Sequence, residues 1–96
     1  MEKHTMSNTI EIIGKLDAIA RARGCEVEQV AISLERREAA IIFINQASEV
    51  YSAHSYTWWD GEALPNNTHW GAYDLNLDMA RKVWAEKSRQ FMQGWK

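Results

Sequence analysis

Between Gly24 and Gly61 the chain contains neither glycine nor proline, although both occur elsewhere in its 96 residues. A segment without these breakers forms either one long helix or strands joined by turns that lack the usual turn residues. The interpretation of this segment therefore determines the fold class.

The helical interpretation places a helix over about residues 26–53, with apolar residues on one face: Val27, Val30, Ala31, Leu34, Ile41, Ile44 and Tyr51. The alternative is a hairpin at residues 30–45 that turns at Glu35–Glu38. This turn would be Glu-Arg-Arg-Glu, which contains no residue that readily takes a positive φ. All four residues are good helix formers. The sequence favours the helix, and an α+β fold with the hairpin is the alternative.

Within that helix, four consecutive apolar residues would cover every side of one turn: Ile41, Ile42, Phe43 and Ile44. A helix that is apolar all round must be buried all round. We therefore expect these residues to be covered by other helices or by a second copy of the chain, which predicts self-association as a homo-oligomer, most simply a dimer. In a central strand the same residues would need no such explanation.

Two further helices are predicted, at residues 8–23 and 75–93. Asn8 and Glu11 form a capping box at the start of the first, and Gly24 suits its end. Asp74 is the expected cap of the second helix, whose apolar stripe contains Leu77, Ala80, Val83, Trp84, Phe91 and Trp95.

Residues 54–73 interrupt this helical pattern with turn residues and aromatic rings. Asp60-Gly61 is a turn signal, and Tyr56–Leu64 could form a short hairpin around it. With residues 1–7 expected to be frayed, the prediction is one mostly α domain over residues 1–96. It has helices at about 8–23, 26–53 and 75–93 and an aromatic-rich loop or short hairpin at 54–73.

The stretch from Glu38 to Ala80 contains no Lys or Arg, six acidic residues and seven of the ten aromatic residues of the chain. Such a composition is unsuited to nucleic acid, which requires cations to contact phosphates. It suits a partner with a basic surface, because aromatic rings and carboxylates both attract Lys and Arg.

If Tyr56, Trp58 and Trp59 lie on a strand, adjacent residues point to opposite faces, so Trp58 and Trp59 cannot both face the core; a helical or irregular segment would weaken this argument. One of the two indoles should be at the surface or in a binding site. The residues expected to bind a partner or ligand are Tyr56, Trp58, Trp59, Asp60, Glu62, Trp70 and Tyr73.

The sequence contains no pattern typical of a catalytic, metal or cofactor site. His4, His54 and His69 lack the spacing of metal ligands, and no nucleophile elbow or phosphate-binding loop occurs. A single cysteine, Cys25, favours a reducing compartment, and no apolar run is long enough to cross a membrane. We expect a small, acidic cytoplasmic protein without catalytic residues, metal or cofactor.

These features together predict a non-catalytic protein-interaction module that regulates or inhibits a larger basic protein through an acidic, aromatic surface. The alternative is a small-molecule binding protein with a pocket lined by Trp58, Trp59, Trp70 and Tyr73, for which a cationic ligand is suited.

Overall fold

The computed structural model describes the chain from residue 8 to residue 93, with side chains described up to residue 89. It contains two helices and four strands in the order α1 (Thr9–Ala22), β1 (Glu26–Ser33), β2 (Glu38–Asn45), β3 (Val50–Thr57), β4 (Trp70–Leu75) and α2 (Leu77–Gln93). The predictions for residues 1–7 and for the side chains of Phe91 and Trp95 lie outside the described residues. The fold is α+β, so the prediction of a mostly helical, three-helix protein is wrong.

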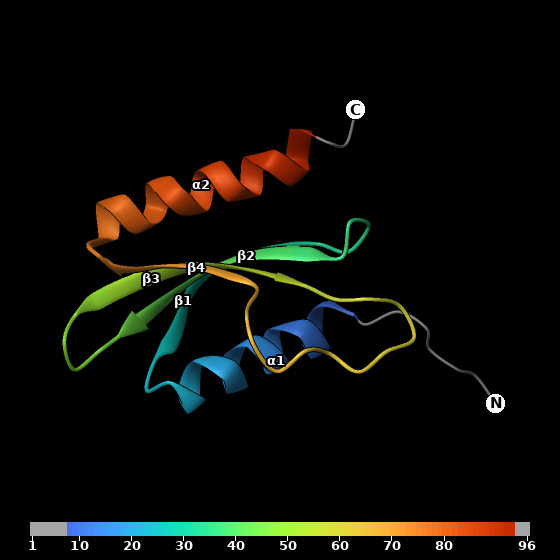
Figure 1. Ribbon diagram of the computed structural model, residues 1–96, viewed down its shortest axis with the longest axis horizontal. Helices are drawn as coiled ribbons and strands as arrows, with labels where there is room; N and C mark the ends of the chain where they lie inside the picture. The colour runs from blue at the N-terminus through green and yellow to red at the C-terminus, as the bar shows by residue number, and fades with distance from the viewer. Residues whose placement is uncertain (1–7, 94–96) are drawn as a thin grey trace.

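The four strands form one antiparallel sheet in the order β1-β2-β3-β4. Figure 1 shows three layers, with α2 on one face of the sheet and α1 on the other. Strands β2 and β3 are central and β1 and β4 are the edges. Each strand follows its neighbour in sequence, so every connection joins adjacent antiparallel strands.

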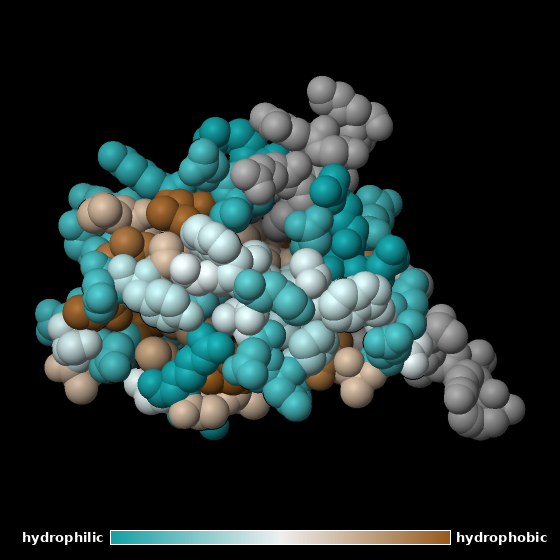
Figure 2. Space-filling view, viewed as in Figure 1, coloured by the Kyte–Doolittle hydropathy of each residue, from teal (hydrophilic) through white to brown (hydrophobic). Residues whose placement is uncertain are grey.

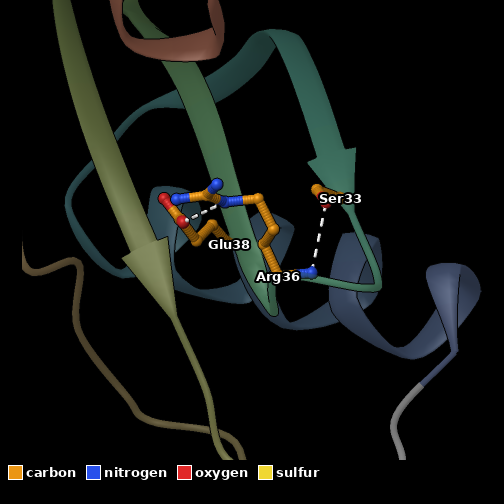
Figure 3. A network of polar contacts seen from close by, with 3 residues as sticks. All are labelled: Ser33, Arg36 and Glu38. Carbon is orange, nitrogen blue, oxygen red and sulfur yellow. Dashed lines mark hydrogen bonds and ion pairs between the residues drawn. The ribbon is translucent and has the colours of Figure 1, made fainter. Parts of the chain in front are cut away.

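The predicted helix at 26–53 is wrong because this segment forms β1, β2 and the start of β3. The hairpin kept as the alternative is the observed structure: β1 and β2 pair from Glu26 with Ile44 to Ser33 with Glu38. The turn between them places Arg37 at φ 56°. Around this turn the Arg36 N–H donates to Ser33 Oγ at 3.2 Å, and the Arg36 guanidinium pairs with Glu38 at 3.0 Å (Figure 3).

The connection between β2 and β3 also turns without glycine. Glu49 takes φ 58°, and the Asn45 side chain accepts hydrogen bonds from the N–H groups of Ala47 and Ser48 at 3.1 and 3.3 Å. Arg and Glu rarely adopt positive φ, which is why neither turn could be recognised from its residues.

Strand β3 pairs with β4, not with the residues directly after Asp60-Gly61. The predicted short hairpin over Tyr56–Leu64 is therefore wrong, although Gly61 does occupy a turn at φ 78°. Residues 58–69 form a long connection that passes alongside α1 in Figure 1. The Tyr56 hydroxyl donates to the Pro65 carbonyl at 2.7 Å, and Arg23 donates to Asn67 Oδ1 at 3.3 Å.

The two predicted terminal helices are confirmed within one or two residues of the observed bounds. Asn8 and Glu11 form the expected capping box of α1, and Gly24 follows that helix at φ 73°. The cap of α2 is Asn76, which accepts from the Met79 N–H at 2.8 Å, and not Asp74.

Both faces of the sheet are buried, which explains the continuous apolar run in β2. Ala39, Ile41 and Phe43 point toward α1 and pack in one core with Ile12, Leu16, Ile19, Ala20, Tyr56 and Trp58. Ala40 and Ile42 point the other way, toward α2, where the Trp84 indole donates to the Ala40 carbonyl at 2.9 Å. Over the described residues, neither helix has the length and apolar character needed to cross a bilayer.

Candidate functional site

The structure separates the seven predicted binding residues into a buried group and an exposed group. Tyr56 and Trp58 belong to the core beneath α1. Trp58 is 2% exposed and its neighbour Trp59 is 55% exposed. The expectation that one of the two indoles faces outward is confirmed, and the outward ring is Trp59.

Tyr56 has a structural role in this core. Burial raises the pKa of its hydroxyl to about 12, so the hydroxyl stays protonated at neutral pH. It can therefore donate continuously to the Pro65 carbonyl, which ties the connection 58–69 to β3.

The exposed aromatic residues gather along edge strand β4. Trp70 is 38% exposed and lies on the α2 side, where Lys87 Nζ is 4.1 Å from the centroid of its indole. Tyr73 is 60% exposed and lies on the α1 side, edge-on to His54 at 5.2 Å between centroids. The Trp59 indole lies beside the ring of His69, the residue that precedes β4, with 6.0 Å between the two ring centroids.

The fold brings cations to the stretch that has none in its own sequence. Arg37 pairs with Asp60 at 3.4 Å, and Lys87 covers Trp70. The cation-free composition therefore does not translate into a cation-free surface. Of the acidic residues near the exposed aromatics, Glu62 and Asp74 are exposed and form no ion pair within the described part of the chain.

The residues predicted to mediate self-association are placed inside the protomer. Ile41, Ile42 and Phe43 are buried between the two helices, and Ile44 is half-buried at the end of β2. Their burial is explained by the central position of β2 and no longer requires a second copy. Self-association itself stays a prediction.

His54 is a buried histidine inside the protein, next to the exposed Tyr73. Its Nε2 lies 2.8 Å from Ser52 Oγ and its Nδ1 lies 3.3 Å from Thr68 Oγ1. Burial, with Arg23 nearby, lowers its pKa to about 4, against the smaller opposing effect of a hydrogen bond with the Trp70 backbone. The ring is therefore neutral at pH 7, and its two nitrogens are engaged with hydroxyls of the protein.

Gly71 makes room for this arrangement. A Cβ atom at this position would lie 2.8 Å from His54 Nδ1 and 2.8 Å from the Tyr73 hydroxyl. The two side chains can therefore close over the backbone of β4 only because residue 71 has no side chain.

A cavity of about 320 Å³ opens beside Tyr73, where β4 ends and the β2–β3 turn comes close. Tyr73 and Asp74 line one side, and Tyr51 with polar residues of the turn lines the other. Asp74 is in the left-handed region at φ 59°, at a point where β4 has one residue more than β3 between paired positions. Such a bulge redirects side chains at the end of a strand.

Sequence reasoning identified Tyr73 but missed Tyr51, Asp74 and the cavity between them. Tyr51 was assigned to a helix face and Asp74 to a helix cap. The sequence signal that points to this site is the Tyr73-Asp74 pair, because it places an aromatic residue next to an acidic residue that tolerates positive φ.

A second hollow, of about 540 Å³, lies between the end of α1, the start of β1 and the β2–β3 turn. Its charged lining residues are of both signs, Asp17, Arg21 and Glu26, and Asp17 and Arg21 already pair with each other at 3.2 Å. Neither hollow has a tryptophan in its lining, so the predicted Trp-lined pocket has no counterpart in these two. No group of three potential metal ligands occurs among the described residues.

The side of the molecule that faces the viewer in Figure 2 is mostly hydrophilic, with apolar residues in scattered places. This side has no broad apolar surface that would indicate a binding site. The exposed rings along β4 are therefore the stronger candidate for one. Comparisons with protein-family models, curated proteins and solved structures find no match, so no relative assigns a role to these residues.

Proposed function

We propose that this protein is a non-catalytic interaction module that binds a partner protein at the β4 edge, which we define as residues Trp70–Asp74. The observation that carries the proposal is an edge strand with large exposed rings on both sides, Trp70 toward α2 and Tyr73 toward α1. Aromatic residues dominate binding energy at protein interfaces because they bury a large rigid surface. A sheet edge can also pair with an extended segment of another chain.

The other edge of the sheet supports this choice by contrast. Strand β1 contains the exposed acidic residues Glu26 and Glu28 and has an irregular register between Val27 and Gln29. Charges and bulges protect an edge from added strands. From Trp70 to Tyr73 the β4 edge contains no charged residue. Both edges contain a bulge, at Asp74 in β4 as well as in β1, so the contrast rests on the charges, and by that measure the β4 edge is the less protected one.

The charges around the β4 edge favour a basic partner. Trp70 already contacts Lys87 and Asp60 already pairs with Arg37, so these two groups are occupied. Asp74 at the end of the edge and Asp78 in the first turn of α2 remain exposed. A partner with Lys or Arg near its binding segment would meet unneutralised carboxylates at that end. A larger basic protein regulated by this module fits these requirements.

The test is capture of a partner from nuclease-treated lysate with the wild-type protein and two variants. Trp70→Ala/Tyr73→Ala removes both rings of the β4 edge. Ile10→Ala removes an apolar side chain that is 81% exposed on α1 and serves as the matched control. Circular dichroism establishes that each variant is folded.

We expect a protein that is captured by the wild type and by Ile10→Ala and is lost with the double variant. Hydrogen exchange of the complex should then show protection of β4 amides. Equal capture by the folded double variant would contradict the proposal.

A further inference from the structure

The cavity of about 320 Å³ at the end of β4 has the size of a small-ligand site, although it lies at the low end of that range. Tyr73 of β4 lines it on the α1 side of the sheet, together with Ser52 of β3, whereas the ring of the lining residue Tyr51 points to the α2 side because Tyr51 pairs with Ile44. Tyr73 is 60% exposed, so its ring can be reached from solvent. The cavity therefore offers aromatic surface to an incoming side chain.

Asp74 gives this cavity a negative charge that the protein does not neutralise. No Lys or Arg lines the cavity, and Asp74 forms no ion pair or side-chain hydrogen bond with the described residues. Arg23, which lies near His54, is engaged elsewhere: it donates to Asn67 and Thr68 and lies over the Phe43 ring at 5.8 Å. The site therefore combines the aromatic ring of Tyr73 with the unpaired carboxylate of Asp74, and both attract a cation.

The backbone conformation places the carboxylate there. Asp74 has φ 59° at a β-bulge, a conformation that is uncommon for residues other than glycine and somewhat less so for Asp. The bulge sets Tyr73 and Asp74, which are adjacent in sequence, in the lining of one cavity. Residues held in such conformations are frequent at binding sites.

We propose that this cavity is a socket for an arginine side chain of the partner, an inference that rests on the proposed function. Arginine suits it better than lysine because a planar guanidinium stacks on aromatic rings and has five N–H donors. Asp74 and the hydroxyls of Ser48 and Ser52, which also line the cavity, supply acceptors. The arginine would thus reach the cavity from a segment bound along the β4 edge.

The test uses N-acetyl-arginine methylamide as the probe and N-acetyl-citrulline methylamide as its neutral, nearly isosteric control. Each is titrated into ¹⁵N-labelled protein and followed by amide chemical shifts. We expect saturable shifts near Tyr73, Asp74 and Ser48 with the arginine probe and none with citrulline. Equal binding of both probes, or shifts spread over other surfaces, would overturn the socket.

Two acid variants sharpen the test. Asp74→Asn removes the charge but keeps a residue that tolerates positive φ, and we expect roughly fivefold weaker binding of the arginine probe, the effect of a partly exposed ion pair. Asp78→Asn removes an exposed acid that does not line the cavity and should leave binding unchanged. The same affinity in both variants would contradict the assignment.

The socket and the proposed function fail in different ways. If the arginine probe does not bind but partner capture still depends on Trp70 and Tyr73, the socket is wrong and the interaction module stands. If the probe binds with the Asp74 dependence but capture ignores the aromatic rings, the socket stands and the β4 edge is not the partner site.

Discussion

At the scale of single residues, His54 couples the stability of the protein to pH. Its pKa of about 4 in the folded protein lies below the usual value of 6.5, because its ring is buried and Arg23 lies nearby. The unfolded chain therefore binds this proton more tightly than the folded protein. We expect full stability above pH 6.5 and a loss of up to about 3 kcal/mol as the pH falls through this range towards 4.

Denaturant unfolding at a series of pH values from 4 to 7.5 measures this effect. His54→Gln should flatten the profile, even if the variant is less stable at pH 7. The control is His69→Gln, which removes an exposed histidine and should preserve the acid-induced loss. An unchanged pH dependence in the His54 variant would show that another group is responsible.

Gly71 and Gly14 provide a matched pair of glycines in different surroundings. A Cβ at Gly71 would meet His54 and Tyr73 at 2.8 Å, whereas a Cβ at Gly14 in α1 meets nothing within 4 Å. We expect Gly71→Ala to lower the free energy of unfolding by about 1–3 kcal/mol, as other overpacking substitutions do. Gly14→Ala should raise it by about 0.5–1 kcal/mol, because alanine favours the helix. Thermal unfolding of both variants is the measurement, and a neutral Gly71→Ala would mean that the two rings move aside freely.

At the scale of elements, both ends of α1 were predictable because they depend on local residues, whereas the cap of α2 is Asn76 and not the predicted Asp74. The capping box at Asn8 and Glu11 and the left-handed Gly24 are each readable within a few positions. The β1–β2 hairpin was predicted only as the alternative and the β2–β3 hairpin was not predicted, since the residues with positive φ in their turns are Arg37 and Glu49. The favourable pairing of β2 with β1 and β3 outweighs their unfavourable turns, and such long-range pairing has no local signal.

The β1–β2 turn allows this explanation to be tested. Arg37→Gly and Arg37→Ala both remove the guanidinium and its exposed pair with Asp60. Glycine takes φ 56° without a steric clash, whereas the Cβ atom of alanine still clashes with the backbone at this φ. We expect the glycine variant to be more stable than the alanine variant by about 1 kcal/mol in denaturant unfolding. If alanine is as stable as glycine, the turn has relaxed to another conformation.

At the scale of the whole molecule, the candidate site was only partly predictable. Alternation along a strand predicted that Trp58 or Trp59 is exposed, and Trp59 is, although β3 ends at Thr57 and the two residues lie just beyond it. The charge of the surface was not predictable, because Lys87 and Arg37 reach Trp70 and Asp60 from segments that are distant in sequence. The cavity beside Tyr73 likewise exists only once β3, β4 and the β2–β3 turn are assembled.

The single sheet shared by the two helical layers predicts that they unfold together. Ile12 of α1 is buried against one face of the sheet, and Trp84 of α2 donates to the Ala40 carbonyl on the other. Ile12→Val should lower the free energy of unfolding by about 0.5–1.5 kcal/mol. Trp84→Phe removes one hydrogen bond and should lower it by about 1–2 kcal/mol.

Native-state hydrogen exchange distinguishes shared from separate unfolding. With a common core, each substitution should accelerate the slowest-exchanging amides of both helices by the same factor, including those of the helix that it does not touch. If Ile12→Val leaves the protection of α2 unchanged, α1 opens independently. The sheet and α2 would then be the cooperative unit, and the β4 edge would stay formed while α1 unfolds.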